Sequence, residues 1–161
     1  MSFFKITGSS LIVFPIKYID GDNSYIVTTI HQNAFHENSL LTNVTILKGI
    51  TKIEESAFYG CSSLTSVTFK DNLHSICGNA FNGCTLLASV VIPESVESIG
   101  TFAFAYCTSL TSITIPANVA NIETNPFNGC TALTEITVDE NNSNYISENG
   151  ILFNKNKTTI M

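Results

Sequence analysis

"AFAYCTSLTSITIP", residues 103–116, decides the fold, because the chain writes nearly the same stretch four times. The other copies are "AFYGCSSLTSVTFK" at 57–70, "AFNGCTLLASVVIP" at 80–93 and "PFNGCTALTEITVD" at 126–139. One cysteine in each copy sets the period at 23 residues: Cys61, Cys84, Cys107 and Cys130. A fixed period in the twenties is typical of solenoids, in which every repeat forms one coil that stacks on the next.

The apolar residues around each cysteine indicate what one coil contains. A phenylalanine stands three residues before it, a leucine three after, and a valine or isoleucine six after. The following V-x-I step alternates, so it predicts a short strand with both side chains on one face. The segment "SIGTFAFAYC" at 98–107 is shorter than an average helix and predicts one short helical turn. We therefore predict a repeat solenoid with one short parallel β-strand and one short helical turn in each 23-residue coil.

Energetics explain why the repeat occurs in several copies. Burying about seven large apolar side chains contributes roughly 10–20 kcal/mol to one coil. Ordering the backbone costs about 1–2 kcal/mol for each residue, so a lone coil is unstable. Stacking shields both faces of each coil and predicts continuous rows of like residues along the body. Phe58, Phe81, Phe104 and Phe127 are expected to line up in one such row.

The full pattern L-x-x-V-x-I-P-x-x-V-x-x-I-G-x-x-A-F-x-x-C resembles the leucine-rich repeat of the BspA-like family, found in bacterial and protist surface proteins. The tail "NNSNYISENGILFNKNKTTIM" at 141–161 is similar to the longer variant unit of that family. Departures are Tyr106 for glycine, Pro126 for alanine, and Cys77 where Gly100 stands one unit later. We expect one leucine-rich repeat domain over 1–161, with an irregular first coil at 1–29, regular repeats at about 30–138 and a variant, truncated last coil at 139–161.

Composition limits the partners. The net charge is −6 and only 12% of residues are charged, so neither nucleic acid nor an anionic membrane surface is an expected partner. No apolar run approaches the ~20 residues that cross a bilayer, so we expect no membrane insertion in this segment. The N-terminal stretch has one lysine and a broken apolar run, and therefore contains no clear signal peptide.

The outward-facing strand residues are the candidate partner-binding site. Stacked about 4.8 Å apart, they would form a hydroxyl-rich and almost uncharged strip that can hydrogen-bond a protein or a glycan. Serine and threonine are also simply good exposed strand residues, and that reading stays open. Ice binding is a weak third reading, because the threonine rows are interrupted. The candidate residues are Asn43, Thr45, Ser66, Thr68, Ser89, Val91, Ser112, Thr114, Glu135 and Thr137.

The cysteines and other polar motifs predict no cofactor and no metal. We expect the four periodic cysteines to be buried free thiols whose S–H groups reach backbone carbonyls, with a disulfide ladder as the alternative. Zinc would need ligands from several coils, since no C-x-x-C pair occurs. "DGDN" at 20–23 lacks the later residues of a calcium loop and is interpreted as a tight turn. No constellation of nucleophile, base and acid supports an enzyme.

The functional hypothesis is a non-catalytic recognition or adhesion module. The resemblance implies display on a cell surface or secretion, with host or extracellular matrix proteins as typical partners. The alternative is a structural spacer or stalk with no ligand of its own. We see no polar cap in the sequence, and an uncapped edge can pair with a second copy, so self-association through the ends is also open.

Overall fold

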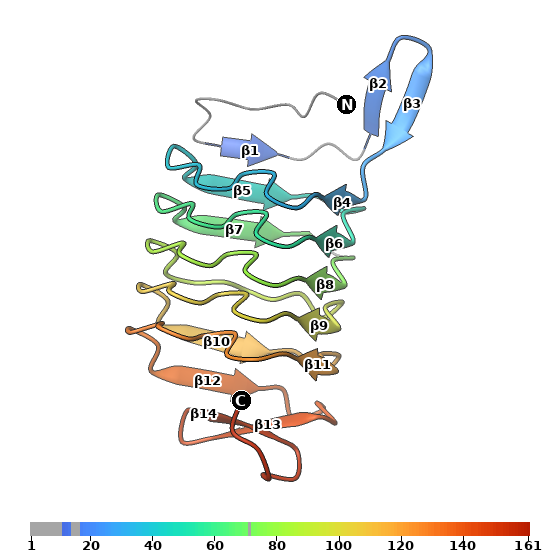
Figure 1. Cartoon of the computed structure of the whole chain (residues 1–161). Coiled ribbons are helices and arrows are strands. Elements are labelled where there is room, and N and C mark those ends of the chain that lie inside the picture. Colours follow the sequence, from blue (N-terminus) through green and yellow to red (C-terminus); the bar gives the residue numbers. More distant parts are fainter. Residues whose placement is uncertain (1–10, 14–16, 71) are drawn as a thin grey trace.

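The computed structural model describes residues 11–13, 17–70 and 72–161. The chain winds into a column of stacked coils, with the long strands along one side and shorter strands along another (Figure 1). This is the predicted solenoid, and the coil-to-coil pairing of both kinds of strand is parallel.

The long strands form two sheets with a gap between them. β1 (Leu11–Val13), β5 (Asn43–Ile46) and β7 (Ser66–Phe69) make a three-stranded parallel sheet. β10 (Ser112–Ile115) and β12 (Glu135–Val138) make a two-stranded one. Pairing keeps the 23-residue register, since Val44 lies opposite Val67 and Ile113 opposite Ile136.

The short strands form one continuous sheet in the order β11-β9-β8-β6-β4. Each has two residues, of which the second is a buried isoleucine. They are β4 (Thr29–Ile30), β6 (Lys52–Ile53), β8 (Ser75–Ile76), β9 (Ser98–Ile99) and β11 (Asn121–Ile122). This sheet therefore holds the coils together where the long-strand sheets do not.

A column of phenylalanine rings fills the interior beside the turns, as predicted. Neighbouring rings stack with centroids 5.2, 5.1, 5.4 and 6.1 Å apart. The column runs through Phe35, Phe58, Phe81, Phe104 and Phe127. Offset stacking of this kind adds about 0.5–1.5 kcal/mol per pair to the energy of burial.

Each periodic cysteine ties its coil to the one before. Its Sγ donates to the carbonyl oxygen of the phenylalanine 26 residues earlier, at 3.1, 3.3, 3.3 and 3.0 Å for Cys61, Cys84, Cys107 and Cys130. All five cysteines of the chain are free, and these four are buried. The predicted free thiols and their carbonyl partners are thus confirmed.

The predicted helical turn in each coil is not found. The described residues form no helix there, and none that could cross a membrane. Positive φ angles recur inside these segments, for example 55° at Ser56 and 67° at Gly60, then 54° at Phe102 and 55° at Tyr106. A right-handed helix requires negative φ throughout, so these segments are successive tight turns.

The strand expected at 89–92 is also absent, and this segment, called the open segment below, separates β7 from β10. Prolines explain the loss. In intact coils the residue after the strand donates its N–H to the previous coil, as Lys70 does to Ile46 at 2.8 Å and Asp139 to Ile115 at 2.9 Å. Pro93 and Pro116 stand at that position and have no N–H.

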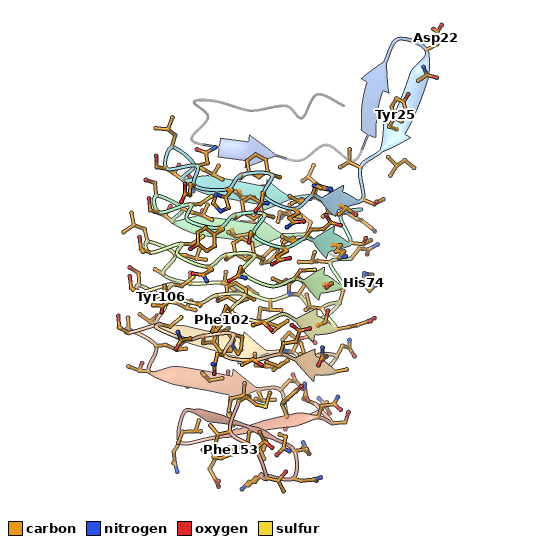
Figure 2. All side chains as sticks on the ribbon, viewed as in Figure 1. Asp22, Tyr25, His74, Phe102, Tyr106 and Phe153 are labelled. Carbon is orange, nitrogen blue, oxygen red and sulfur yellow. The ribbon has the colours of Figure 1, made fainter. Side chains whose placement is uncertain are left out.

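Two antiparallel hairpins flank the regular coils. β2 (Lys17–Asp20) and β3 (Asn23–Ile26) project from the column, with Asp22 at the tip (Figure 2), so the tight-turn interpretation of 20–23 is confirmed. β13 (Tyr145–Glu148) and β14 (Ile151–Asn154) lie beyond β12.

The C-terminal hairpin covers the interior of the preceding coil. Tyr145 and Leu152 join the buried core, and the Tyr145 hydroxyl accepts a hydrogen bond of 2.7 Å from the Ile122 N–H. Asn142 is buried and donates to the carbonyls of Pro116 and Val119, at 2.7 and 3.1 Å. The expectation that this side of the last coil exposes its apolar interior, without a cap, is therefore wrong.

Candidate functional site: the strand face

The strand face is the outward surface of β5, β7, the open segment, β10 and β12. Alternation turns one residue of every pair outward and the other inward, and in β10 the inward residues Ile113 and Ile115 are buried beside the exposed Thr114. The structure places eight predicted site residues in these four strands and two, Ser89 and Val91, in the open segment. Those that are exposed are Thr68, Ser89, Val91, Ser112, Thr114 and Glu135, whereas Asn43, Thr45, Ser66 and Thr137 are half-buried.

At both ends of the strand face, polar side chains hydrogen-bond to one another along the stack. Asn43 donates from Nδ2 to the Ser66 hydroxyl at 2.6 Å. The hydroxyls of Thr114 and Thr137 lie 2.8 Å apart and share one hydrogen bond. Glu135 is the one carboxylate among the ten predicted residues, so the face is polar but carries little charge.

The centre of the strand face is different, because a groove of about 610 Å³ opens beside the open segment. Val67, Thr68 and Phe69 form one wall, and Val91, Pro93, Glu94 and Ser95 form the other. Ser95 donates from its hydroxyl to the Leu73 carbonyl at 2.8 Å, which fixes the loop that closes this wall. Sequence reasoning placed Val91 on the face but missed the groove. The sequence signal that could have predicted the groove is the pair Pro93 and Pro116, one directly after residues 89–92 and one directly after β10.

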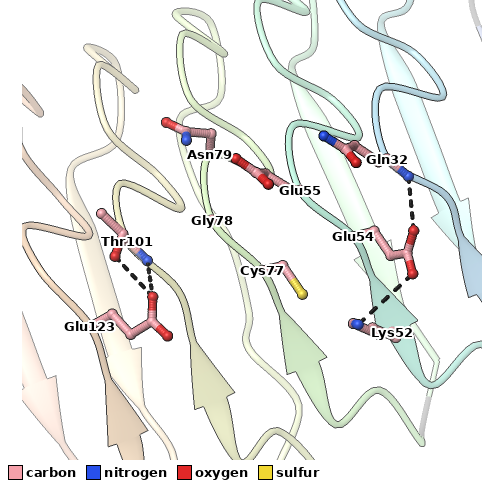
Figure 3. Close-up of a pocket in the computed structure, with 9 residues that line it drawn as sticks. All are labelled: Gln32, Lys52, Glu54, Glu55, Cys77, Gly78, Asn79, Thr101 and Glu123. Carbon is pink, nitrogen blue, oxygen red and sulfur yellow. Dashed lines mark hydrogen bonds and ion pairs between the residues drawn. The ribbon is translucent and has the colours of Figure 1, made fainter.

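A second groove, of about 570 Å³, lies at the ends of the short strands (Figure 3). It forms because Cys77 and Gly100 occupy the position that carries Glu54 and Glu123 in the flanking coils. Gly100 is required there, since a Cβ would come within 2.5 Å of the Gly78 nitrogen. Sequence reasoning noted the Cys77 departure but not the groove.

Two of the three carboxylates that line the second groove, Glu54 and Glu123, accept hydrogen bonds from the fold itself. Glu54 Oε2 accepts the Gln32 N–H at 3.1 Å, and Glu123 Oε2 accepts the Thr101 N–H and hydroxyl at 2.9 and 2.8 Å. Lys52 lies 3.8 Å from Glu54 Oε1. Within the part of the chain that the structure describes, no group of three potential ligands could hold a metal ion. Glu55 is the third carboxylate that lines this groove (Figure 3).

The buried thiols are poor nucleophiles. Burial raises the pKa of Cys61 to about 12 and shifts the pKa of Cys107 upward as well. The thiolate is the nucleophilic form, so these residues act as small buried side chains with a weak donor.

Comparison with known proteins identifies the repeat. A family model described as the BspA type leucine rich repeat region matches residues 28–158 in six copies. A search of curated proteins found no match.

Solved bacterial structures share the architecture. A leucine-rich repeat protein from Bacteroides ovatus is 33% identical with a TM-score of 0.73, and the match covers 80% of this chain and 33% of that one. The leucine-rich repeat protein of T. pallidum is 30% identical with a TM-score of 0.75, over 80% of this chain and 58% of that one. A leucine rich cell surface protein from Faecalibacterium prausnitzii is 28% identical with a TM-score of 0.53, over 92% and 52%. This chain therefore spans less than two thirds of each.

Proposed function

Because the chain belongs to the BspA-type leucine-rich repeat family, we propose that it is a non-catalytic recognition module that binds a protein or glycan partner through the strand face. One observation carries the proposal: the exposed residues of this face form a nearly uncharged polar surface with a groove at its centre. Such a surface meets a partner with little cost for removing charges from water.

We further propose that the protein acts at a cell surface or after secretion. The support is family membership together with the Faecalibacterium neighbour, which is described as a cell surface protein. Host or extracellular matrix proteins are then the partners to test first. Catalysis is not proposed, because Glu54 and Glu123 of the second groove accept backbone hydrogen bonds and the buried thiol of Cys61 stays protonated.

Binding of the immobilised chain to purified fibronectin, laminin and collagen, and to a glycan array, tests this function. The variant Ser66→Lys/Ser112→Lys/Thr114→Lys places three charges on the strand face and should weaken binding at least tenfold. The control Ser62→Lys/Thr124→Lys/Asn128→Lys carries the same charge on exposed or turn positions away from that face and should bind normally. Equal binding by both variants would exclude the strand face. Binding to none of the probes would favour a spacer.

A further inference from the structure

The groove at the open segment exposes a residue position that is sealed in the coils of β5 and β10. Phe69 faces inward and is partly exposed, whereas Ile46 and Ile115 at the same repeat position are 0% exposed. Val67 also lines the groove wall. The floor of the groove is therefore part of the hydrophobic core that solvent can reach through the gap between β7 and the open segment.

The rim of the groove carries an exposed apolar side chain as well. Val91 is 82% exposed, more than any other large hydrophobic side chain among the described residues. It stands where Thr45, Thr68 and Thr114 stand in the other coils. An exposed valine beside an apolar floor, with Pro93 next to it, favours an aliphatic or aromatic group over a sugar ring.

Backbone groups of the open segment, whose Val91 lines the groove, have no hydrogen-bond partner within the described part of the fold. The open segment pairs with neither neighbour, because β7 pairs with β5 and β10 pairs with β12. Across the described ranges, neither the N–H nor the C=O groups of 89–92 form a hydrogen bond. Unpaired backbone groups cost about 1–3 kcal/mol each when they are removed from water. An occupant of this groove therefore needs donors and acceptors of its own, which a peptide backbone carries in equal number.

We infer that the groove anchors an extended segment of a protein partner, which inserts one aliphatic or aromatic side chain toward Val67 and Phe69. The peptide groups on either side of that anchor hydrogen-bond to the unpaired backbone of 89–92. This inference rests on the proposed function, because it names a protein partner and a contact point on the same strand face. Among the described residues that line the groove Glu94 is the one acid, so the lining they form imposes little charge requirement on the segment.

Amide NMR of the labelled chain tests the inference with small probes. N-acetyl-leucine methylamide and N-acetyl-phenylalanine methylamide carry one side chain and two peptide groups. We expect saturable shifts at Val67, Phe69 and Val91, with a Kd on the order of 1 mM, the range for ligands of this size. N-acetyl-serine methylamide should bind at least tenfold more weakly. Equal binding of the serine probe, no saturation by 20 mM, or tighter binding of methyl glucoside at these residues would overturn the inference.

Two variants locate the site. Val91→Lys changes an exposed side chain and should weaken binding of the leucine probe at least tenfold, while Asn128→Lys, exposed and away from the strand face, should leave its Kd unchanged. An unchanged Kd for Val91→Lys would contradict the inference. The spectra of both variants confirm that they fold.

The outcomes separate the two proposals. If the three-lysine variant retains its partner while the probes fill the groove, the strand-face function fails and the groove remains an apolar peptide site. If that variant loses its partner while Val91→Lys retains it, the face is used and the groove is not the anchor.

Discussion

The turn side and the long-strand side of each coil are built on the same period but respond differently to changes in sequence. On the turn side, stacked phenylalanine rings and cysteine-to-carbonyl hydrogen bonds join the coils, together with backbone hydrogen bonds such as Phe58 N–H to the Ala80 carbonyl at 2.8 Å. On the long-strand side, the backbone holds them, and the sheet is interrupted at 89–92. The difference teaches that the missing N–H groups of Pro93 and Pro116 can open a backbone ladder even though its inward-facing apolar side chains are all present.

The largest effect is expected from breaking the column. Phe81 is 0% exposed and stacks on Phe58 and Phe104, so Phe81→Ala should lower the free energy of unfolding by about 3–5 kcal/mol. The matched control, Leu86→Ala, truncates an exposed side chain of the same coil and should cost less than about 1 kcal/mol. Urea denaturation measures both. Similar losses would show that the turn side is not where stability concentrates.

The next largest effect is expected at high pH, where ionisation of the buried cysteines on the turn side should lower the free energy of unfolding. Cys61 stays protonated in the folded chain up to a pKa of about 12, while its unfolded pKa is 9.0. The stabilisation from its burial is therefore complete below pH 9 and is lost as pH rises from 9 toward 12. Each such thiol lowers the free energy of unfolding by up to about 1.4 kcal/mol per pH unit in that window.

Denaturation at pH 7, 9 and 10 checks this sign. Cys61→Ala removes one thiol and should flatten the decline by up to the contribution of one group. A stability that rises between pH 9 and 10 would contradict the burial of these thiols.

A smaller effect is expected from repairing the long-strand side. The double variant Pro93→Ala/Pro116→Ala supplies two backbone N–H groups. By their place in the repeat they can donate to the carbonyl oxygens of Phe69 and Ile92. Each new hydrogen bond contributes about 1 kcal/mol, which the lost rigidity of proline largely offsets, so the net change should stay within about 1 kcal/mol.

Hydrogen exchange gives the sharper readout for this repair. Amides at 89–92 should exchange at least tenfold faster than those of β5 in the parent chain. Protection should rise in the double variant. Parent amides at 89–92 that are as protected as those of β5 would show that the ladder is already closed.

The smallest effect concerns one turn residue. Tyr106 has φ of 55° at the position where Gly60, Gly83 and Gly129 stand, and it projects at the outer edge of the turns (Figure 2). Tyr106→Gly should stabilise the chain by about 0.5 kcal/mol, because glycine adopts this conformation without strain but is freer when unfolded. Gly83→Ala is the opposite change and should destabilise it. Calorimetry compares the two melting temperatures.

Much of the interior could be predicted because the period alone brings like residues together. The phenylalanine row, the buried thiols and the parallel register all follow from residues 23 apart. The gap at 89–92 could not be predicted from its own residues, which have good strand propensity. Part of the cause is Pro116 in the next coil, because it has no N–H to donate back to residues 89–92. The turns were misjudged because Ser56 and Phe102 adopt positive φ, a conformation for which these residue types have little preference.

The candidate site was predictable only in outline. Alternation predicted which strand residues face outward, and six of the ten are exposed in the structure, while the other four are half-buried. The groove depends on Phe69 losing its cover, which is a property of the space between two coils and not of either coil alone. Whether the ten face residues bind a partner stays a prediction.

The cysteine-to-phenylalanine hydrogen bond reaches one coil back and no further. An in-frame duplication or deletion of 23 codons would therefore leave every such bond with a partner. Unequal recombination in genes for proteins of this kind can therefore change the number of coils while each of these hydrogen bonds is kept. The length of the solenoid is then a trait that evolution can adjust separately from the fold.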